Sequence, residues 1–366
     1  MGFFGRKRAP SVPHPRKEPR FDGPLTLKRL EQIFQDCVDF TKRPVSLGEG
    51  GACTLTLCYL SGMVKMERVS DYVLRPLAQD EALARCGTPR QAMEEMMGGA
   101  LYNLSAAERT TLDEAAFDLV AGWCLMFFPG ESAVLSLFVG TEEKRSISSP
   151  SNETVLKGSR DAFVESLRTN TSIVRRHLKT PELRIREQVV GRQSVTSVDI
   201  LYIEGLTNPH LVEQVAAQLA DIDIDAVLAT GNIEEYIVPA ARTAFPLVQY
   251  TERSDRFCAG LAEGRVGILI DGLPLGYLAP GVLGDFLQAP QDKSESWLLA
   301  SALTLLRYLC MLGTLLLPAL YVAMVTFHQE MIPTRLALSI IAAKQDVPFR
   351  SDVPEPHLEC RRDADR

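Results

Sequence analysis

The chain has 366 residues, of which 46% are hydrophobic and 23% charged, so it holds enough apolar material for two or three globular domains. Its net charge of −7 gives no electrostatic support for binding nucleic acid, and no nucleic-acid partner is expected. The eight cysteines are scattered and form no C-x-x-C pair, which predicts buried, reduced thiols rather than a disulfide framework or a zinc site.

Residues 1–22 are predicted to be a basic, disordered arm. The first 20 residues contain six Lys or Arg and four Pro, and they lack the apolar run of a secretory signal peptide. Two interpretations stay open for this arm: a solvated tail, or a contact with anionic lipid at the cytoplasmic face of a membrane. The basic composition of the arm and the absence of a signal peptide favour a cytosolic N-terminus.

Residues 23–145 are predicted to form a first α/β subdomain. Apolar residues recur at helical spacing in some stretches, and short apolar runs bounded by Gly or Pro indicate strands in others. The predicted elements are a helix at 26–40, a strand at 53–60, helices at 69–77 and 114–121, and a hairpin formed by 124–128 and 133–138.

Residues 146–290 are predicted to form a second α/β subdomain, joined to the first by the polar stretch 141–160. Asp271-Gly272 is a strong hairpin turn. The predicted elements are a helix at 161–179, a strand at 198–203, helices at 211–219 and 256–261, and a hairpin formed by 266–270 and 275–278.

The two subdomains repeat one order of elements and one spacing of glycines. Leu57-x-Tyr59-x-x-Gly62 aligns with Ile200-x-Tyr202-x-x-Gly205, and Gly122 and Gly130 align with Gly264 and Gly272. Glycine recurs where a chain must turn. We therefore predict an α/β fold with two tandem subdomains, with an internal duplication as the hypothesis for their origin.

Residues 291–349 are predicted to be a membrane region, followed by a charged tail at 350–366. The segment 297–327 carries one charge, Arg307, and the 20 uncharged residues from Tyr308 to Phe327 span about 30 Å as a helix, the thickness of a hydrocarbon core. Pro333 suits the first turn of a further helix at 333–345.

One face of the predicted membrane helix carries polar residues and a proline. It consists of Arg307, Thr314, Pro318 and Tyr321. Either Arg307 lies near the membrane interface, or this face packs on partner helices, because an Arg inside a bilayer is costly unless it snorkels or faces protein or water. The charges that flank the helix have both signs and do not fix its orientation.

No catalytic, cofactor-binding or metal-ligating residues are predicted. GEGGA at 48–52 lacks the rest of a nucleotide fingerprint, and DIDID at 221–225 lacks the Gly and Glu of a calcium loop. The five histidines are isolated, and His177 is interpreted as part of a solvated helix face. The sequence therefore favours a protein that is not an enzyme.

Three long stretches resemble a known family. Residues 316–343 (LLPALYVAMVTFHQEMIPTRLALSIIAA), 153–183 and 249–274 are similar to the GerA family, the A subunits of bacterial spore germinant receptors. The resemblance covers residues 25–349 and includes Gln329, Glu330 and Pro333 directly after the helix. It implies a two-part cytosolic region on the core side of the inner spore membrane, followed by several membrane helices.

The resemblance also implies partners and a function. Family members assemble with B and C subunits, and self-association into an oligomer is a further expectation. The complex senses small nutrients such as amino acids or sugars and is thought to open an ion path. Which subunit binds the nutrient is left open, and no cofactor is implied.

Two departures from the family pattern bear on this expectation. Ser159 stands where the family has Pro, and residues 350–366 are charged where family members continue with further membrane helices. The hypothesis at this stage is a truncated or frameshifted form. The alternatives are a membrane-anchored scaffold, a small-molecule-binding protein without receptor activity, a membrane-anchored enzyme, and a non-functional product.

Overall fold

The computed structural model describes residues 20–47, 53–79, 83, 86, 88–100, 105–140, 161–226, 246–288, 292, 296–328 and six positions between 333 and 342. The chain divides into two compact units, Met1–Asp285 and Phe286–Arg366. The predicted arm, linker and charged tail, except for Arg20 to Asp22, lie outside the described residues.

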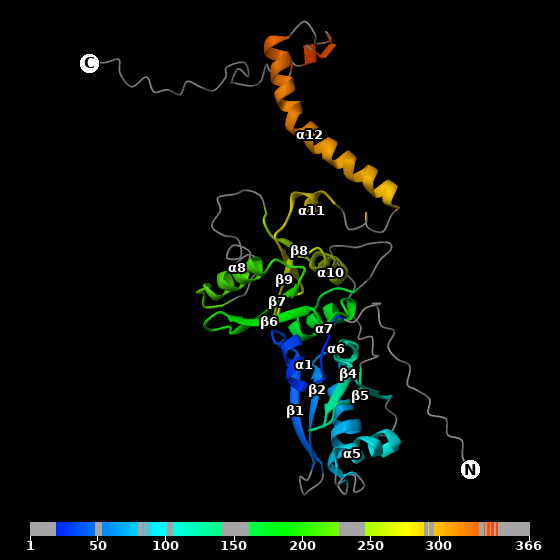
Figure 1. The fold of residues 1–366 in the computed structure, drawn as a ribbon. Helices are drawn as coiled ribbons and strands as arrows, with labels where there is room; N and C mark the ends of the chain where they lie inside the picture. The colour runs from blue at the N-terminus through cyan, green and yellow to red at the C-terminus, as the bar shows by residue number, and fades with distance from the viewer. Residues whose placement is uncertain are drawn as a thin grey trace. The chain divides into compact units, whose positions relative to one another are not determined.

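The first unit begins with a five-stranded antiparallel sheet in the order β1-β2-β4-β5-β3 (Figure 1). Cys53–Leu60 is a strand, as predicted, and Trp123–Phe127 and Val134–Phe138 form the predicted hairpin. The elements are α1 (Leu27–Ile33), β1 (Phe40–Leu47), β2 (Cys53–Leu60), α2 (Met66–Arg68), the π-helix η1 (Val69–Leu74), α3 (Arg75–Gln79), α5 (Pro89–Glu95), the π-helix η2 (Met96–Ala100), β3 (Ala106–Arg109), α6 (Leu112–Val120), β4 (Trp123–Phe127) and β5 (Val134–Phe138).

The second half of this unit contains another five-stranded antiparallel sheet, in the order β6-β7-β9-β10-β8. Position for position this is the strand order of the first sheet, which confirms the predicted tandem α/β arrangement. The elements are α7 (Leu167–His177), β6 (Leu183–Val190), β7 (Thr196–Ile203), α8 (Pro209–Ala220), β8 (Gln249–Thr251), α10 (Ser254–Ala262), β9 (Val266–Ile270), β10 (Gly276–Ala279) and α11 (Leu283–Leu287).

Apolar residues cover both faces of each sheet. Every residue of β4 and of β9 is buried. Because neighbouring residues of a strand point to opposite faces, Leu57 packs with η1 and α3, whereas Cys58 packs with α1 and α6. In the second sheet α8 covers one face, and α7 and α10 cover the other. Two helix-covered sheets therefore supply four apolar layers.

The aligned glycines make the same close approach in both halves. Each stands after a helix with a left-handed backbone: φ is 85° at Gly122 and 87° at Gly264. A Cβ at Gly122 would lie 3.0 Å from the Met63 carbonyl oxygen, and one at Gly264 would lie 3.1 Å from that of Leu206. Met63 and Leu206 follow the aligned turn glycines Gly62 and Gly205. The sequence repeat thus marks a structural repeat.

Some predicted elements are wrong. The helix expected at 26–40 ends at Ile33, and Phe40 already begins β1. The helix expected at 161–179 is shorter, Leu167–His177. Strands β1, β3, β6 and β8 were not predicted, and all four are edge strands of their sheets. Edge strands tolerate charged residues and proline, so the apolar pattern that indicates a strand is weak in them.

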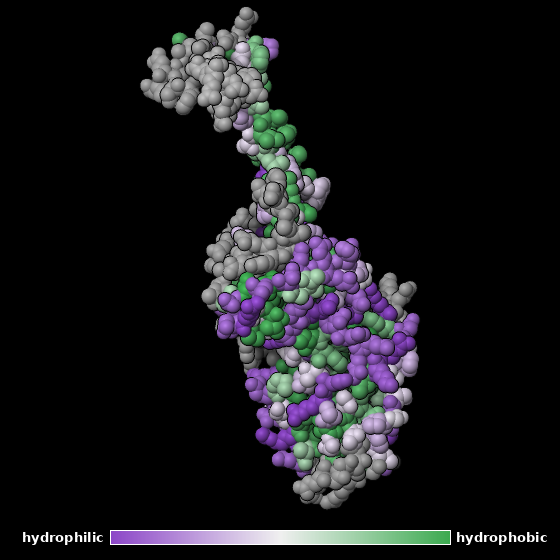
Figure 2. Space-filling view, turned by 90° about the vertical axis from the view of Figure 1, so that its left-hand side faces the viewer, coloured by the Kyte–Doolittle hydropathy of each residue, from purple (hydrophilic) through white to green (hydrophobic). Residues whose placement is uncertain are grey.

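The second unit contains α12 (Trp297–Phe327), a 31-residue helix with Pro318 inside it. None of its residues is buried, and its surface is mostly hydrophobic (Figure 2). Among the described residues it is the one helix long and apolar enough to cross a membrane. The bounds agree with the predicted span at 297–327.

Candidate functional site

The two sheets of the first unit meet where the segment between α1 and β1 lies beside the start of β6. The backbone amide of Val38 donates to the Ile185 carbonyl oxygen at 3.0 Å. The backbone amide of Ile185 in turn donates to the Asp36 carbonyl oxygen at 3.2 Å. Cys37 and Ile185 thereby form a parallel bridge. The edge strand β6 is extended at this point by backbone from the first subdomain.

A buried ion pair involves Asp39, two residues after the bridged Cys37. Arg175 of α7 donates through Nε to Asp39 Oδ2 at 2.8 Å and through Nη2 to Asp39 Oδ1 at 3.0 Å. The third guanidinium nitrogen, Nη1, donates to the Leu183 carbonyl oxygen at 3.0 Å. Only 1% of the Arg175 side chain and 3% of the Asp39 side chain are exposed. The guanidinium group and the carboxylate therefore meet each other's hydrogen-bonding needs in a place that water does not reach.

The charged form of Arg175 is retained despite burial. Burial favours loss of its proton, but the Asp39 carboxylate and the Cys37 thiol outweigh this effect, and the pKa of the guanidinium is raised above its ordinary value. Removing either partner would leave an uncompensated buried charge, which is far more costly than losing an exposed pair. The pair therefore acts as a strong clamp between the two subdomains.

Several weaker contacts surround the clamp. Arg184 of β6 donates to the Ile33 carbonyl oxygen and to Glu204. Arg20 pairs with Glu182 at 2.8 Å, and the Tyr202 hydroxyl donates to Asp36 at 3.4 Å. The contacts of Arg184 with Ile33 and of Tyr202 with Asp36 join the two subdomains, and Arg20 joins the end of the N-terminal arm to the second subdomain. Together they make the junction between the sheets a polar, hydrogen-bonded interface.

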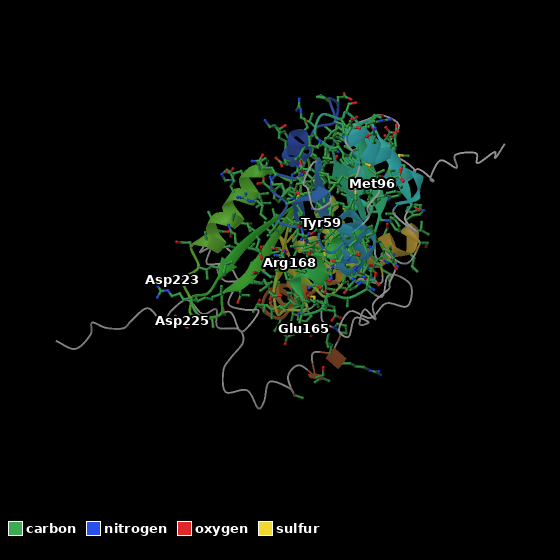
Figure 3. All side chains as sticks on the ribbon, turned by 90° about the horizontal axis from the view of Figure 1, so that it is seen from below. Tyr59, Met96, Glu165, Arg168, Asp223 and Asp225 are labelled. Carbon is green, nitrogen blue, oxygen red and sulfur yellow. The ribbon has the colours of Figure 1, made fainter. Side chains whose placement is uncertain are left out.

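Asp199 is a second buried carboxylate of this region. It lies on β7, is fully buried, and accepts from Arg168 Nη1 at 3.2 Å through Oδ2, while Oδ1 is buried without a hydrogen-bond partner. Arg168, labelled in Figure 3, also pairs with Glu187 at 2.6 Å. Burial raises the pKa of Asp199 to about 7, although Arg168 lowers it in part. Asp199 therefore titrates near neutral pH.

A serine, a histidine and an aspartate also lie close together, but their geometry does not suit nucleophilic catalysis. Nε2 of His177 lies 3.2 Å from Ser254 Oγ and 3.5 Å from an Asp161 carboxylate oxygen, so one ring nitrogen faces both partners. A catalytic relay needs the serine and the aspartate on opposite ring nitrogens. His177 is 30% exposed and ties α7 to α10, so the interpretation as a solvated helix face was incomplete.

No metal site emerges from the described part of the chain, where no group of three His, Cys, Asp or Glu could hold an ion. The aspartates of the 221–225 segment lie in a loop at the periphery of the second subdomain (Figure 3). Asp223 pairs with Arg192 at 2.6 Å, and both side chains are about two-thirds exposed. GEGGA at 48–52 lies outside the described residues.

In the second unit, Arg307 of α12 is paired with a residue that precedes the helix. Its Nη2 donates to Asp292 Oδ1 at 3.0 Å, and its Nη1 donates to Asp292 Oδ2 and, at 3.1 Å, to the Leu287 carbonyl oxygen. Sequence reasoning missed Asp292 as this partner. The signal that could have indicated it is the polar stretch that contains Asp292 and directly precedes the apolar helix.

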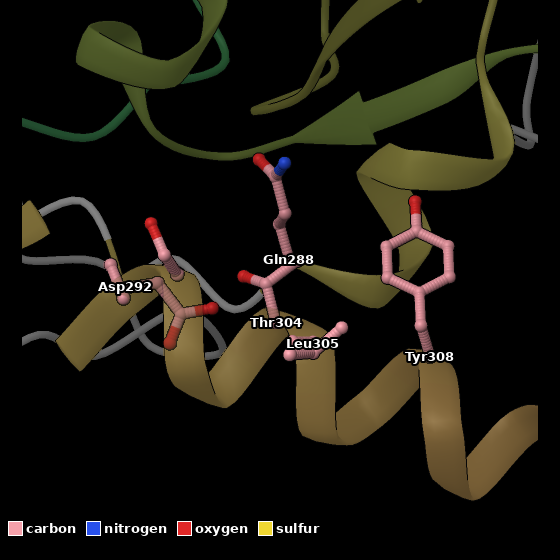
Figure 4. A pocket seen from close by; sticks show the side chains of 7 residues that line it. Gln288, Asp292, Thr304, Leu305 and Tyr308 are labelled. Atoms are coloured by element: carbon pink, nitrogen blue, oxygen red, sulfur yellow. The ribbon is translucent and has the colours of Figure 1, made fainter. Parts of the chain in front are cut away.

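A pocket of about 500 Å³ lies beside the same turns of α12. Thr304 and Tyr308 of α12 line it together with Gln288, which precedes the helix (Figure 4). Its remaining lining residues are Asp292, Ala300, Ser301 and Leu305. Polar groups thus gather around the first third of α12.

The structure places the other predicted residues of the helix face along α12. Thr314 Oγ1 donates to the Met311 carbonyl oxygen of its own helix, and Tyr321 is 41% exposed. Pro318 lies within the helix. Of the residues after the helix, Pro333 is exposed, whereas Gln329 and Glu330 lie outside the described residues. Packing of this face on partner helices stays a prediction.

Residues 28–353 match the family model described as Bacillus/Clostridium GerA spore germination protein. The chain belongs to the GerA family. The resemblance seen in the sequence is confirmed, and with it the prediction that the chain is not an enzyme.

Relatives within the GerA family are similar over most of this chain. Spore germination protein KA of Bacillus subtilis (strain 168) is 34% identical over 88% of the chain and 58% of its own length. Spore germination protein GerLA of Bacillus cereus is 32% identical over 88% of the chain and 65% of its own length. An uncharacterized membrane protein of B. subtilis (strain 168), YfkQ, is 35% identical over 92% of the chain and 64% of its own length. The chain thus spans about three-fifths of the length of these curated relatives.

A solved structure supports the fold of this GerA-family chain. The crystal structure of the N-terminal domain of the A subunit of the Bacillus megaterium spore germinant receptor GerK3 is similar with a TM-score of 0.58 and 27% identity. The similarity covers 72% of this chain and 99% of that domain. The α/β fold with tandem subdomains is therefore shared with a germinant-receptor domain. A membrane association agrees with α12 and with the name of YfkQ.

Proposed function

We propose that this chain is a membrane subunit of a nutrient germinant receptor that triggers spore germination. The observation that carries the proposal is that the fold of the GerK3 A-subunit N-terminal domain is followed, in this same chain, by a helix that fits a bilayer. The B and C subunits of a germinant receptor, the lipid bilayer and a small amino acid or sugar bound by the complex are its proposed partners.

The proposed mechanism is conformational. A nutrient that binds one of two receptor states more tightly shifts the equilibrium toward that state. The clamp between Asp39 and Arg175 supports a first unit whose two sheets move together rather than independently. Because β10 is followed in the chain by α11 and α12, a displacement of that unit pulls on the membrane helix and so on its partner subunits. Ion release through the assembled receptor would follow.

The proposed location is the inner membrane of the spore, with the first unit on the cytosolic, core side. The basic composition of residues 1–22 supports this orientation. Fusing a reporter that is active only in the cytosol to the N-terminus tests it. Activity of the reporter is expected, and its absence with intact protein in the membrane would contradict the orientation.

Deletion of the gene tests the function. We expect spores without this chain to lose their germination response to at least one amino acid or sugar, and the intact gene to restore it. An unchanged response to every nutrient would contradict the receptor role. Membrane levels of the B and C subunits should be measured in parallel, because loss of germination with both partners still assembled would argue against a scaffold.

A further inference from the structure

Helix α12 is longer than a bilayer requires. Its 31 residues extend over about 46 Å at 1.5 Å per residue, whereas the hydrocarbon core is about 30 Å thick. A helix of this kind either tilts or projects from one face of the membrane. The positions of its polar contacts with residues outside the helix decide between the two arrangements, and those contacts lie in its first third.

Arg307 is held by groups that would have to enter the hydrocarbon with it. Asp292 and the Leu287 carbonyl both come from the segment before the helix, and only 8% of the Asp292 side chain is exposed. Leu287, the last residue of α11, and Asp292 therefore lie beside the turn that carries Arg307. A carboxylate and the carbonyl end of a helix are not stable against lipid tails. The level of Arg307 must then lie at or outside the edge of the hydrocarbon.

The hydroxyl groups of α12 support the same boundary. Ser301, Thr304 and Tyr308 place three hydroxyl groups on the lining of the pocket of about 500 Å³, beside apolar residues, and such a mixed surface suits a membrane interface better than the hydrocarbon core. Beyond Tyr308, the hydroxyls of Thr314 and Thr326 donate to the carbonyl oxygens of Met311 and Val322 in their own helix. Such back-bonding is how hydroxyl side chains are accommodated in lipid.

We propose that the hydrocarbon core begins at Arg307 and Tyr308, and that residues 297–306, together with Leu287 and Asp292, form a surface element that faces lipid headgroups. The membrane-spanning part is then Tyr308–Phe327, whose 20 residues match about 30 Å. This inference goes beyond the receptor role and needs only that α12 crosses a membrane.

Leu305 and Leu315 provide a matched pair of probes. Both are leucines of α12 with large exposed fractions, 61% and 74%, and about 15 Å of helix separates them. The full chain, with Cys310→Ser, would carry Leu305→Cys or Leu315→Cys in nanodiscs of phosphatidylglycerol and phosphatidylethanolamine. Nanodiscs expose both faces, so the result does not depend on orientation. Reaction with a membrane-impermeant maleimide would be followed for each cysteine by mass spectrometry.

We expect Leu305→Cys to react at least 10-fold faster than Leu315→Cys in nanodiscs, and the two rates to agree within about twofold in sodium dodecyl sulfate. Native Cys310, one turn past Arg307, should be protected in the chain that retains it. Equal protection of both introduced cysteines in nanodiscs would overturn the boundary, because it would mean that the first third of α12 is also in lipid.

Arg307→Leu tests what sets the boundary. Without this charge the uncharged run extends from Trp297 to Phe327, so the helix can slide inward. We expect the labelling rate of Leu305→Cys to fall at least fivefold in Arg307→Leu and to be retained in Arg307→Lys. An unchanged rate in Arg307→Leu would overturn the assignment of Arg307 as the residue that fixes the boundary.

Discussion

Arg175 and Asp39 stand 136 positions apart in the sequence and form two hydrogen bonds of 2.8 and 3.0 Å between almost fully buried side chains. Arg175 belongs to the helix that opens the second subdomain, and Asp39 immediately precedes the first strand of the first. The two α/β subdomains are therefore joined by an ion pair of the protein interior.

Breaking this pair should strongly destabilise the first unit. Arg175→Met leaves the Asp39 carboxylate buried without its partner, and the expected loss in the free energy of unfolding is about 3–5 kcal/mol. Urea unfolding of residues 1–285 would measure it, since this stretch is a compact unit and the related GerK3 domain crystallised by itself. Arg192→Met is the control: its pair with Asp223 is exposed, and a change below about 1 kcal/mol is expected.

The double variant Asp39→Leu with Arg175→Met adds a sharper test. Because it leaves no unpaired charge, it should be less destabilised than the sum of the two single variants. Additive losses would show that the two side chains do not stabilise each other, and would contradict the clamp.

Asp199 should make the stability of the first unit depend on pH. Burial raises its pKa from 3.8 to about 7 against the opposing effect of Arg168, and the nearby carboxylates of Glu187, Asp39 and Asp271 raise it further. Between these two pH values the folded state keeps the proton that the unfolded state has lost. Stability therefore falls as pH rises from about 4 to about 7, by up to about 4 kcal/mol.

The variant Asp199→Asn isolates this contribution, since the amide stays neutral at every pH. Its unfolding free energy relative to the unaltered protein should rise between pH 4 and pH 7 and level off above. Urea titrations of both proteins at several pH values would measure the difference. A difference that is constant with pH would refute the elevated pKa.

The aligned glycines allow a comparison of two positions with one backbone conformation. Gly122 and Gly130 have φ of 85° and 83°, but a Cβ at Gly122 meets the Met63 carbonyl oxygen at 3.0 Å, whereas Gly130 faces open space. Gly130→Ala should cost about 1 kcal/mol from backbone strain alone, and Gly122→Ala clearly more. Thermal or urea unfolding of residues 1–285 would compare them.

The second subdomain offers the same comparison. Gly264→Ala meets the Leu206 carbonyl oxygen at 3.1 Å and should be more destabilising than Gly272→Ala, which again faces open space. If the pairs behave differently in the two subdomains, the structural repeat does not extend to these turns.

The buried thiols should be inert in the folded protein. Burial raises the pKa of Cys58 and of Cys258 to about 12, and Cys124 is shifted upward for the same reason. At pH 8 these cysteines are protonated and shielded, so they should react with a thiol reagent only after denaturation. Site-resolved alkylation with and without urea would check this, and rapid labelling of Cys124 in the native protein would contradict it.

The sequence by itself determined the central strands, the repeat and the membrane helix. Strands β2, β4, β5, β7, β9 and β10 are apolar because helices cover both their faces, so their pattern is visible in the chain. The same is true of α12, because the length and apolar composition that fit a bilayer can be read directly from the chain. Long matching stretches carried the family resemblance.

Only the tertiary structure decided how these parts are joined. The edge strands β1, β3, β6 and β8 depend on a neighbouring strand for their hydrogen bonds, and charges or Pro44 interrupt their apolar pattern. The pairs Arg175–Asp39 and Arg307–Asp292 join residues that are far apart in the sequence, so no local spacing of residues predicts them. A charge shows in the sequence, but its partner is fixed by the fold, because ion pairs depend on distance in space.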